Sequence, residues 1–181
     1  MTMTVEPGQL EHDVKRLIRD VPDFPKPGIV FKDITPLLAD ADVFARATQS
    51  MAFAFRGERI THVVGIESRG FILGAPVALH LGAGFVPVRK PGKLPHRVEA
   101  ETYELEYGRD QLEVHADACG AGSRVLLVDD VLATGGTADA TCRLLERLGA
   151  TVQGCSFLVE LGFLNGRGKL GERRIERLVV Y

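Results

Sequence analysis

The stretch Val125–Thr137, V-L-L-V-D-D-V-L-A-T-G-G-T, constrains the fold of this chain more than any other. Its four apolar residues, Val125 to Val128, predict a buried strand, and we expect Asp129 and Asp130 to close that strand. A polar loop from Thr134 to Thr137 follows, after which apolar residues recur at helical spacing. The stretch therefore predicts a strand, an acidic pair, a loop and a helix, in that order.

The loop has the residue types of an anion-binding site. The start of a helix exposes unpaired N–H groups and a partial positive charge, which suits a phosphate. Gly135 and Gly136 let the backbone approach an anion closely, and Thr134 and Thr137 add hydroxyl donors. Together these residues predict a phosphate site.

The acidic pair needs a different partner. Asp129 and Asp130 would repel a phosphate, so they suit neighbouring groups that donate hydrogen bonds, such as ribose hydroxyls, or else a metal ion. A phosphate beside a diol indicates a ribose 5-phosphate. The competing interpretation is a buried strand with a solvated turn and a capped helix, which accounts less well for the whole combination.

A second strand, turn and helix lie upstream. His62–Ile66 predicts a short strand, Glu67–Gly70 a tight polar turn, and Phe71–Leu81 a helix. Arg69 lies in the turn, where the helix dipole disfavours a cation that lacks an anionic partner. We therefore expect Arg69 to bind a diphosphate bidentately, although a surface arginine is the simpler alternative.

The N-terminal part predicts two helices with an irregular segment between them. The helices span Gln9–Arg19 and a run through Phe44 and Phe55, the second with Asp42 as its N-cap. The prolines and glycine of Asp23–Ile34 predict an extended path whose backbone groups are not used by secondary structure. Such a segment suits recognition of the edge of a flat heterocycle, and a connecting loop is the alternative.

The segment Val98–Asp117 predicts a β-hairpin that turns at Tyr107–Asp110. We expect Glu99 and Glu101 to be solvated, and the hairpin to be mobile because it has few apolar residues. The other predicted elements are strands over Gly84–Val88, Thr151–Leu161 and Leu178–Tyr181, and a glycine-rich loop over Asn165–Gly171.

Alternating strands and helices predict an α/β fold with a mostly parallel sheet, helices on both faces, and a ligand site beyond the carboxyl ends of the strands. The net charge of −2 and the pI of about 6.2 argue against nucleic-acid binding. The chain lacks an apolar run of ~18 residues, so we expect no membrane partner. Three cysteines without metal-ligand spacing, and a Met1–Gln9 segment unlike a signal peptide, predict a cytoplasmic protein with reduced thiols.

The D-D-x-x-A-T-G-G-T sequence at Asp129–Thr137 resembles the 5-phosphoribosyl 1-pyrophosphate (PRPP) motif of type I phosphoribosyltransferases. The F-P-x-P-G-I-x-F sequence at Phe24–Phe31 resembles the hood that holds adenine in the adenine phosphoribosyltransferase branch of that family. A response-regulator receiver domain also carries an acidic pair after an apolar strand, but the pair lies near the start of that domain and no T-G-G-T loop follows it.

The resemblance implies the type I phosphoribosyltransferase fold as one domain over residues 1–181, with a hood over 1–36 and a mobile hairpin over 90–117. It implies conversion of adenine and PRPP to AMP and pyrophosphate with Mg²⁺, in purine salvage, by a homodimer. PRPP itself would hold most of the Mg²⁺ coordination, and no protein ligand is assigned.

The resemblance also implies roles for single residues. Ala133 and the Thr134–Thr137 loop would hold the 5-phosphate, while Asp129 and Asp130 would meet the ribose hydroxyls. Arg69, after a turn in which the Glu67–Ser68 peptide would be cis, would bind the pyrophosphate.

For the lysines, the base and the hairpin, the resemblance implies further contacts. Lys90 and Lys93 would reach the pyrophosphate, in the same subunit or across the dimer. Phe31 would stack on adenine, and backbone groups of Val30 and Lys32 would read its Watson–Crick edge. Glu106, with Tyr107, would act from the hairpin as an acid/base on the purine ring.

Two other functions stay open at the level of sequence. A phosphoribosyltransferase for another purine, such as xanthine, would share the PRPP loop and differ in the hood. A non-catalytic PRPP-binding regulator would keep the fold and bind nucleic acid through a basic surface.

Overall fold

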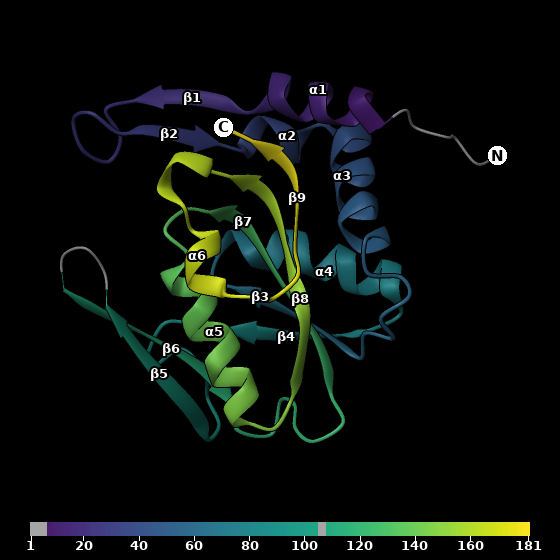
Figure 1. Ribbon diagram of the computed structural model, residues 1–181, viewed down its shortest axis with the longest axis vertical. Coiled ribbons are helices and arrows are strands. Elements are labelled where there is room, and N and C mark those ends of the chain that lie inside the picture. Colours follow the sequence, from purple (N-terminus) through teal and green to yellow (C-terminus); the bar gives the residue numbers. More distant parts are fainter. Residues whose placement is uncertain (1–6, 105–107) are drawn as a thin grey trace.

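The computed structural model describes residues 7–104 and 108–181, and within these residues five parallel strands form the central sheet (Figure 1). The strand order is β4-β3-β7-β8-β9. The strands are β3 (His62–Ile66), β4 (Gly84–Val88), β7 (Arg124–Leu132), β8 (Thr151–Glu160) and β9 (Ile175–Val180). Because every neighbouring pair is parallel, the carboxyl ends of all these strands lie at one edge of the sheet.

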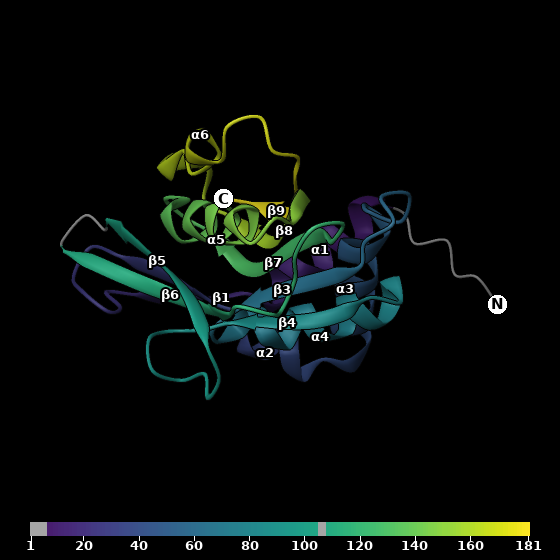
Figure 2. The same ribbon diagram turned by 90° about the horizontal axis from the view of Figure 1, so that it is seen from below.

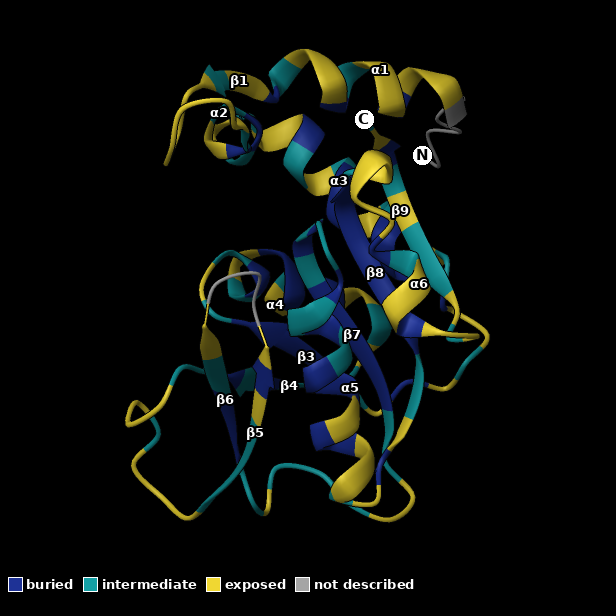
Figure 3. Ribbon diagram, turned by 60° about the vertical axis from the view of Figure 1, so that its left-hand side comes forward, coloured by how far each residue is buried: buried dark blue, intermediate teal, exposed yellow. Residues whose placement is uncertain are grey.

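Helices cover both faces of the sheet, as the sequence predicts. The helices α1 (Pro7–Leu17), α3 (Ala41–Phe53) and α4 (Arg69–Leu81) pack on one face, and α5 (Gly136–Arg147) packs on the other (Figure 2). Successive residues of β7 alternate between the two cores: Leu126 contributes to the core with α3 and α4, and Leu127 to the core with α5. The three inner strands β3, β7 and β8 are accordingly mostly buried, whereas the edge strands β4 and β9 are partly exposed (Figure 3).

The N-terminal segment forms a small layer beyond the carboxyl edge of the sheet (Figure 1). It contains a two-stranded antiparallel sheet of β1 (Arg19–Pro22) and β2 (Val30–Asp33), followed by the short helix α2 (Thr35–Ala39). The irregular path predicted for residues 23–34 is therefore wrong for β2, which pairs with β1. The irregular part is the turn between them, where Asp23 Oδ1 accepts the Gly28 N–H at 2.7 Å.

A second antiparallel pair, β5 (Val98–Glu104) and β6 (Arg109–His115), projects from the body of the molecule (Figure 2). The predicted hairpin strands are confirmed, but the turn predicted at Tyr107–Asp110 is wrong for Arg109 and Asp110, which belong to β6 and pair with β5. Its base is fixed to the residue after β4, because Arg89 and Glu113 exchange backbone hydrogen bonds of 2.9 and 2.8 Å. Leu112 and Val114 are fully buried in the core beside α5.

Several predicted boundaries need correction. Helix α1 begins and ends two residues before the predicted span, and α4 begins at Arg69 rather than Phe71. The N-cap of α3 is Asp40, whose carboxylate accepts the Val43 N–H at 3.0 Å, and Asp42 lies in the first turn. The predicted loop over residues 165–171 contains the short helix α6 (Arg167–Leu170), which follows the 3-10 turn η1 (Gly162–Leu164). Strand β9 begins three residues before the predicted start at Leu178.

In the described part of the chain, no helix combines the length and the apolar content that a membrane span requires.

Candidate active site

A cavity of about 570 Å³ opens at the carboxyl ends of β3 and β7. Three segments far apart in the sequence line it: the strand β2 of the N-terminal layer, the turn between β3 and α4, and the loop between β7 and α5. The candidate residues in its wall are Val30, Phe31, Lys32, Arg69, Lys90, Asp129, Asp130, Ala133, Thr134, Gly135, Gly136 and Thr137. The structure thus brings together most of the residues that the sequence singles out.

The acidic pair forms the floor of this cavity. Asp129 and Asp130 do not close β7, as the sequence suggested, because β7 continues to Leu132 through its pairing with β8. Asp130 is 5% exposed, and its N–H donates to Asp129 Oδ1 at 2.9 Å. Burial, and then the charge of Asp130, raise the pKa of Asp129 well above its ordinary value. Two carboxylates held this close favour a ligand that donates hydrogen bonds or carries positive charge.

Arg69 faces the acidic pair from the first residue of α4. Its Nε contacts Asp130 Oδ2 as an ion pair, without the alignment of a hydrogen bond. Its guanidinium also lies 5.1 Å from the centroid of the Phe31 ring. Arg69 thus has Asp130 as an anionic partner and also lines the cavity, while its predicted contact with a diphosphate stays a prediction.

The loop after β7 has the geometry of an anion cradle. Gly135 adopts a φ of +79° as the N-cap, so that α5 begins at Gly136. The first turn of this helix, where N–H groups have no partner within the helix, lines the cavity with Gly136, Thr137 and Ala138. A Cβ on Gly135 would lie 2.3 Å from the carbonyl oxygen of Gly166, and a Cβ on Gly166 would lie 2.2 Å from that of Ala133. The loop is therefore shaped by direct backbone packing against Gly166, thirty-one positions downstream of Gly135.

The turn after β3 gathers the basic residues. The Glu67–Ser68 peptide is cis, as the family resemblance implies. Burial would raise the pKa of Glu67, but the hydrogen bonds from Lys93 and the Lys90 N–H, together with the Arg89 guanidinium 3.4 Å away, outweigh it and lower that pKa to about 2. Lys93 pairs with Glu67 and lies outside the cavity wall, whereas Lys90 lines the cavity and pairs with Asp110 of β6.

The hood strand presents a ring and a backbone edge to the cavity. Phe31 packs edge-to-face against Phe24, with ring centroids 5.2 Å apart. The Lys32 ammonium turns away, bonding to Asp20 at 2.6 Å and lying 3.8 Å from the centroid of the Tyr181 ring. Since β2 pairs with β1 along one edge, alternate N–H and C=O groups of β2 point away from β1.

Sequence reasoning missed three residues of this site. Tyr103, in the acidic run before the hairpin turn, is 6% exposed and bonds to Thr137 and Asp110. Gly166 shapes the anion loop from the segment predicted as a plain glycine-rich loop. Glu67 organises the two lysines, and the only sequence signal for it was its place beside Arg69. The predicted acid/base Glu106 and its neighbour Tyr107 lie outside the described residues.

The predicted solvated face of the hairpin is wrong for Glu101. Its side chain is 17% exposed and pairs with Arg143 and Arg147 of α5, while Glu99 makes a marginal 4.0 Å contact with Arg97. Among the described residues, no group of three or more His, Cys, Asp and Glu side chains is arranged to hold a metal ion.

Comparison with known proteins agrees with this geometry. Residues 33–172 match the family described as Phosphoribosyl transferase domain. The adenine phosphoribosyltransferase of Myxococcus xanthus (strain DK1622) is 60% identical over 169 residues, which cover 93% of this chain and 92% of the relative. The crystal structure of adenine phosphoribosyltransferase from Rhodothermus marinus DSM 4252 is similar with a TM-score of 0.92 at 52% identity, covering 96% of this chain and 99% of that one.

A further structure carries ligands. The Saccharomyces cerevisiae adenine phosphoribosyltransferase, complexed with adenine and D-2,5-dideoxy-2,5-imino-altritol 1,6-bisphosphate, is similar with a TM-score of 0.89 at 41% identity. The match covers 95% of this chain and 99% of the yeast chain.

Proposed function

The chain belongs to the adenine phosphoribosyltransferases, and we propose on that premise that it transfers the 5-phosphoribosyl group of PRPP to adenine, giving AMP and pyrophosphate in purine salvage. The observation that carries the proposal is the single cavity shared by the anion loop, the acidic pair and the hood. A phosphate cradle, a partner for hydroxyls and an aromatic ring for a base are the three parts that this reaction needs.

The substrate-binding roles follow from the wall of the cavity. The N–H groups at the start of α5, with Ala133, Thr134 and Thr137, would bind the 5-phosphate. Asp129 and Asp130 would accept hydrogen bonds from the ribose hydroxyls, which relieves the repulsion between the two carboxylates.

The departing pyrophosphate would be bound by basic groups at the mouth of the cavity. Arg69 and Lys90 line the cavity. Lys93 lies outside its wall, paired with Glu67, and would bind the pyrophosphate of this subunit or of a partner subunit. These cations would stabilise the negative charge that develops as the bond to C1′ breaks.

The donor set also fits Mg²⁺. Asp129 and Asp130 offer carboxylate oxygens, and Asp130 Oδ2 has the Arg69 ion pair but no hydrogen-bond partner among the described residues. We propose that PRPP and pyrophosphate supply most ligands of the ion, and no protein ligand is assigned. Once bound, Mg²⁺ would neutralise part of the diphosphate charge.

The base would lie against the hood. Phe31 would stack on adenine, and the outward backbone groups of Val30 and Lys32 would read its Watson–Crick edge. Purine N9 then attacks C1′ on the face opposite to the leaving group. We propose Glu106, beside Tyr107, as the acid/base on the purine ring, so Glu106→Gln is expected to lower kcat more than it raises KM.

Two further properties are proposed from the resemblance and the composition. A homodimer is supported by exposed apolar residues Ile72 and Leu79, which lie seven positions apart on one face of α4. A cytoplasmic location is supported by Cys119, Cys142 and Cys155, which are all free thiols. Light scattering of the purified protein tests the dimer, and fractionation of the source cells tests the location.

The deciding experiment incubates the purified protein with PRPP, Mg²⁺ and each of adenine, hypoxanthine, guanine, xanthine and uracil. AMP is expected to form fastest. Faster turnover of another base would overturn the specificity for adenine, and the absence of turnover with every base, combined with a nucleic-acid gel shift, would favour a regulator.

A further inference from the structure

The hydroxyl of Tyr103 joins groups from three parts of the chain. Thr137 Oγ1 lies 3.2 Å from Tyr103 Oη, Asp110 Oδ2 lies 3.1 Å from it, and Lys90 Nζ lies 3.5 Å from it. Lys90 also pairs directly with Asp110. Tyr103 and Asp110 are cross-strand partners in the β5–β6 pairing, which explains why they meet.

The charges of this group are settled by its contacts. Burial would raise the pKa of Asp110, but Lys90, the Gln111 N–H and Tyr103 outweigh it and lower that pKa, so the carboxylate is ionised. Burial likewise opposes the charge on Lys90, but Asp110 outweighs it and raises the pKa of the lysine. The group therefore holds one ammonium and one carboxylate.

Donor counting then fixes the direction of each hydrogen bond. An ammonium only donates and an ionised carboxylate only accepts, whereas a hydroxyl has one proton to give. Tyr103 gives its proton to Asp110, so it can only accept from Thr137. The single hydroxyl proton of Thr137 is consequently directed at Tyr103.

Thr137 also lines the cavity where the 5-phosphate is proposed to bind. Phosphate oxygens accept hydrogen bonds, so the Thr137 proton serves either Tyr103 or the phosphate, but not both. A phosphate that accepts the Thr137 hydroxyl proton therefore breaks the bond from Thr137 to Tyr103. The Tyr103 hydroxyl, no longer held by Thr137, can then move closer to Asp110. The Asp110 carboxylate therefore keeps one hydrogen-bond donor when Lys90 leaves it.

We propose that Tyr103 is a positioning residue that couples the phosphate loop to Lys90, an inference that rests on the proposed function because it takes the loop to be the 5-phosphate site. Phosphate binding takes the Thr137 proton, releases the Tyr103 hydroxyl, and lets Lys90 exchange Asp110 for the diphosphate. Binding of the 5-phosphate thereby increases the affinity of the site for the diphosphate.

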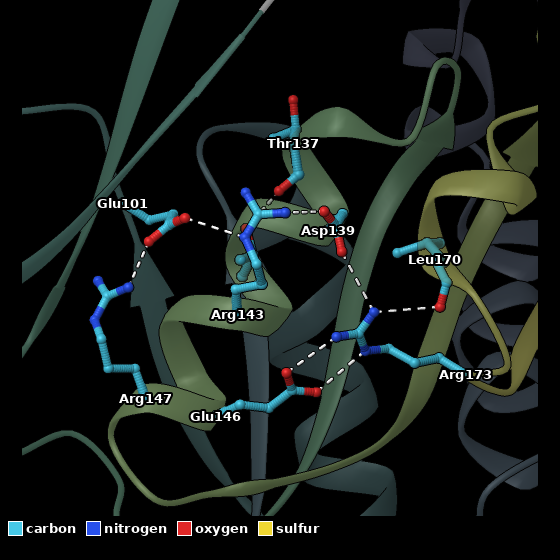
Figure 4. Close-up of polar contacts among 9 residues, drawn as sticks. Glu101, Thr137, Asp139, Arg143, Glu146, Arg147, Leu170 and Arg173 are labelled. Atoms are coloured by element: carbon cyan, nitrogen blue, oxygen red, sulfur yellow. Dashed lines mark hydrogen bonds and ion pairs between the residues drawn. The ribbon is translucent and has the colours of Figure 1, made fainter.

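The surrounding ion pairs hold the hairpin and α5 together, and a cavity between them gives the Tyr103 side chain space to move. The hairpin is tied to α5 by Glu101, which pairs with Arg143 and Arg147 (Figure 4). On its other side α5 is tied to the segment after α6, where Arg173 bonds to Asp139 and Glu146 (Figure 4). Between the hairpin and α5 lies a cavity of about 490 Å³ with Tyr103 and Gly136 in its wall, which leaves room for a small movement of Tyr103.

The test measures whether two probes help each other to bind. Isothermal titration gives the Kd of pyrophosphate with Mg²⁺, first alone and then with saturating ribose 5-phosphate, and the ratio of the two values is the coupling factor. Tyr103→Phe removes the hydroxyl and keeps the ring. It is expected to lower the coupling factor on the order of fivefold relative to the wild type. An unchanged coupling factor in Tyr103→Phe, even if both affinities fall, would overturn the proposal.

Two further variants keep the outcome interpretable. Asp110→Asn releases Lys90 whether or not the loop is occupied, so pyrophosphate alone is expected to bind more tightly and the coupling factor to fall. If Tyr103→Phe does not fold, this variant decides, and a wild-type coupling factor in it counts against the proposal. Thr48→Val is the control, because it removes a buried hydroxyl that bonds to the Phe44 and Ala45 carbonyls in α3, far from the site.

Failure of the coupling and failure of the function are distinguishable. If the wild-type protein bound neither ribose 5-phosphate nor pyrophosphate, the proposed function itself would be wrong. If it bound both, with the same coupling factor in every variant, only the role of Tyr103 would be wrong.

Discussion

Arg69 at the start of α4 lies against Asp130 of β7, so a single guanidinium compensates the acidic pair and also faces the ring of Phe31. The partner carboxylate is almost fully buried, at 5% exposure. A residue in this position stabilises the empty site and is well placed for a diphosphate that enters it.

We therefore expect Arg69→Ala to lower kcat/KM for PRPP by about 10²-fold, as for the loss of other groups that stabilise transition-state charge. Arg69→Lys keeps the charge but loses the planar fork, and should fall between the wild type and the alanine variant. Steady-state kinetics at saturating adenine measures both. A loss of less than about threefold in Arg69→Ala would rule out this role.

Asp129 should show a conflict between stability and activity. Its pKa is raised above the ordinary value of 3.8, so the folded protein binds the Asp129 proton more tightly than the unfolded chain does. The protein therefore loses stability as pH rises from 3.8 through the raised pKa of the folded state. Asp129→Asn keeps an oxygen to accept the Asp130 N–H. It is expected to unfold at a higher urea concentration than the wild type at pH 7, yet to lose turnover.

The matched control for this variant is Asp117→Asn, at an exposed position on the far side of the hairpin. It should leave both the urea midpoint and the turnover as in the wild type. A lower midpoint for Asp129→Asn would contradict the pKa argument.

The shape of the anion loop can be tested at Gly135. Alanine there meets both a φ of +79° and the Gly166 carbonyl oxygen, whereas alanine at Gly82 meets a φ of +65° in open space. We expect Gly82→Ala to cost about 1 kcal/mol in the free energy of unfolding and to leave PRPP affinity intact. Gly135→Ala should cost more and weaken PRPP binding more than tenfold, roughly, by titration calorimetry. Equal effects of the two variants would show that the clash is absorbed.

The lowered pKa of Glu67 makes the free energy of unfolding depend on pH in the acid range. Its pKa is lowered from 4.5 to about 2, so its stabilising contribution is present above about pH 4.5 and is lost as pH falls towards 2. Urea unfolding at pH 5 and pH 3 should show a smaller drop for Glu67→Gln than for the wild type. Glu99→Gln, at a partly exposed glutamate, should show the wild-type drop; a full drop in Glu67→Gln would refute the prediction.

Substitutions at Lys32 and Phe31 separate binding of adenine by backbone groups of β2 from binding by side chains. Lys32 directs its ammonium to Asp20 and Tyr181, so Lys32→Ala should leave the KM for adenine close to that of the wild type. Phe31→Ala should raise that KM about tenfold, because base–aromatic stacking is worth ~1–3 kcal/mol. A comparable rise in Lys32→Ala would mean that its side chain takes part in binding the base.

Local patterns predicted the central elements well, because their signals are contained in the elements themselves. The strand over residues 62–66 is predicted to the residue from its apolar run. The loop predicted over Thr134–Thr137 is right for Thr134 and Gly135 and wrong for Gly136 and Thr137, which form the first turn of α5. The end of β7 was not predictable in this way. A pair of aspartates normally marks the end of a buried strand, and only the pairing of Asp129 with Phe157 and of Val131 with Val159 on β8 carries the strand past them.

Contacts between segments far apart in the sequence could not be predicted from local patterns. Val30–Asp33 became a strand because Arg19–Pro22 lies beside it, and no local period marks that pairing. Tyr103 lies among glutamates, and no local pattern marks it as a buried residue of the site. Its function in the site depends on Thr137, thirty-four positions away.

The packing of Gly135 against Gly166 has a consequence for any attempt to shorten or transplant this site. A fragment that ends after β8 would contain the whole motif Val125–Thr137 and still lack the surface against which its loop is moulded. Grafting the motif into another sheet would meet the same obstacle. The smallest transferable unit of phosphate recognition here is therefore a pair of segments, and the second of them, at Gly166, lies outside the Val125–Thr137 motif.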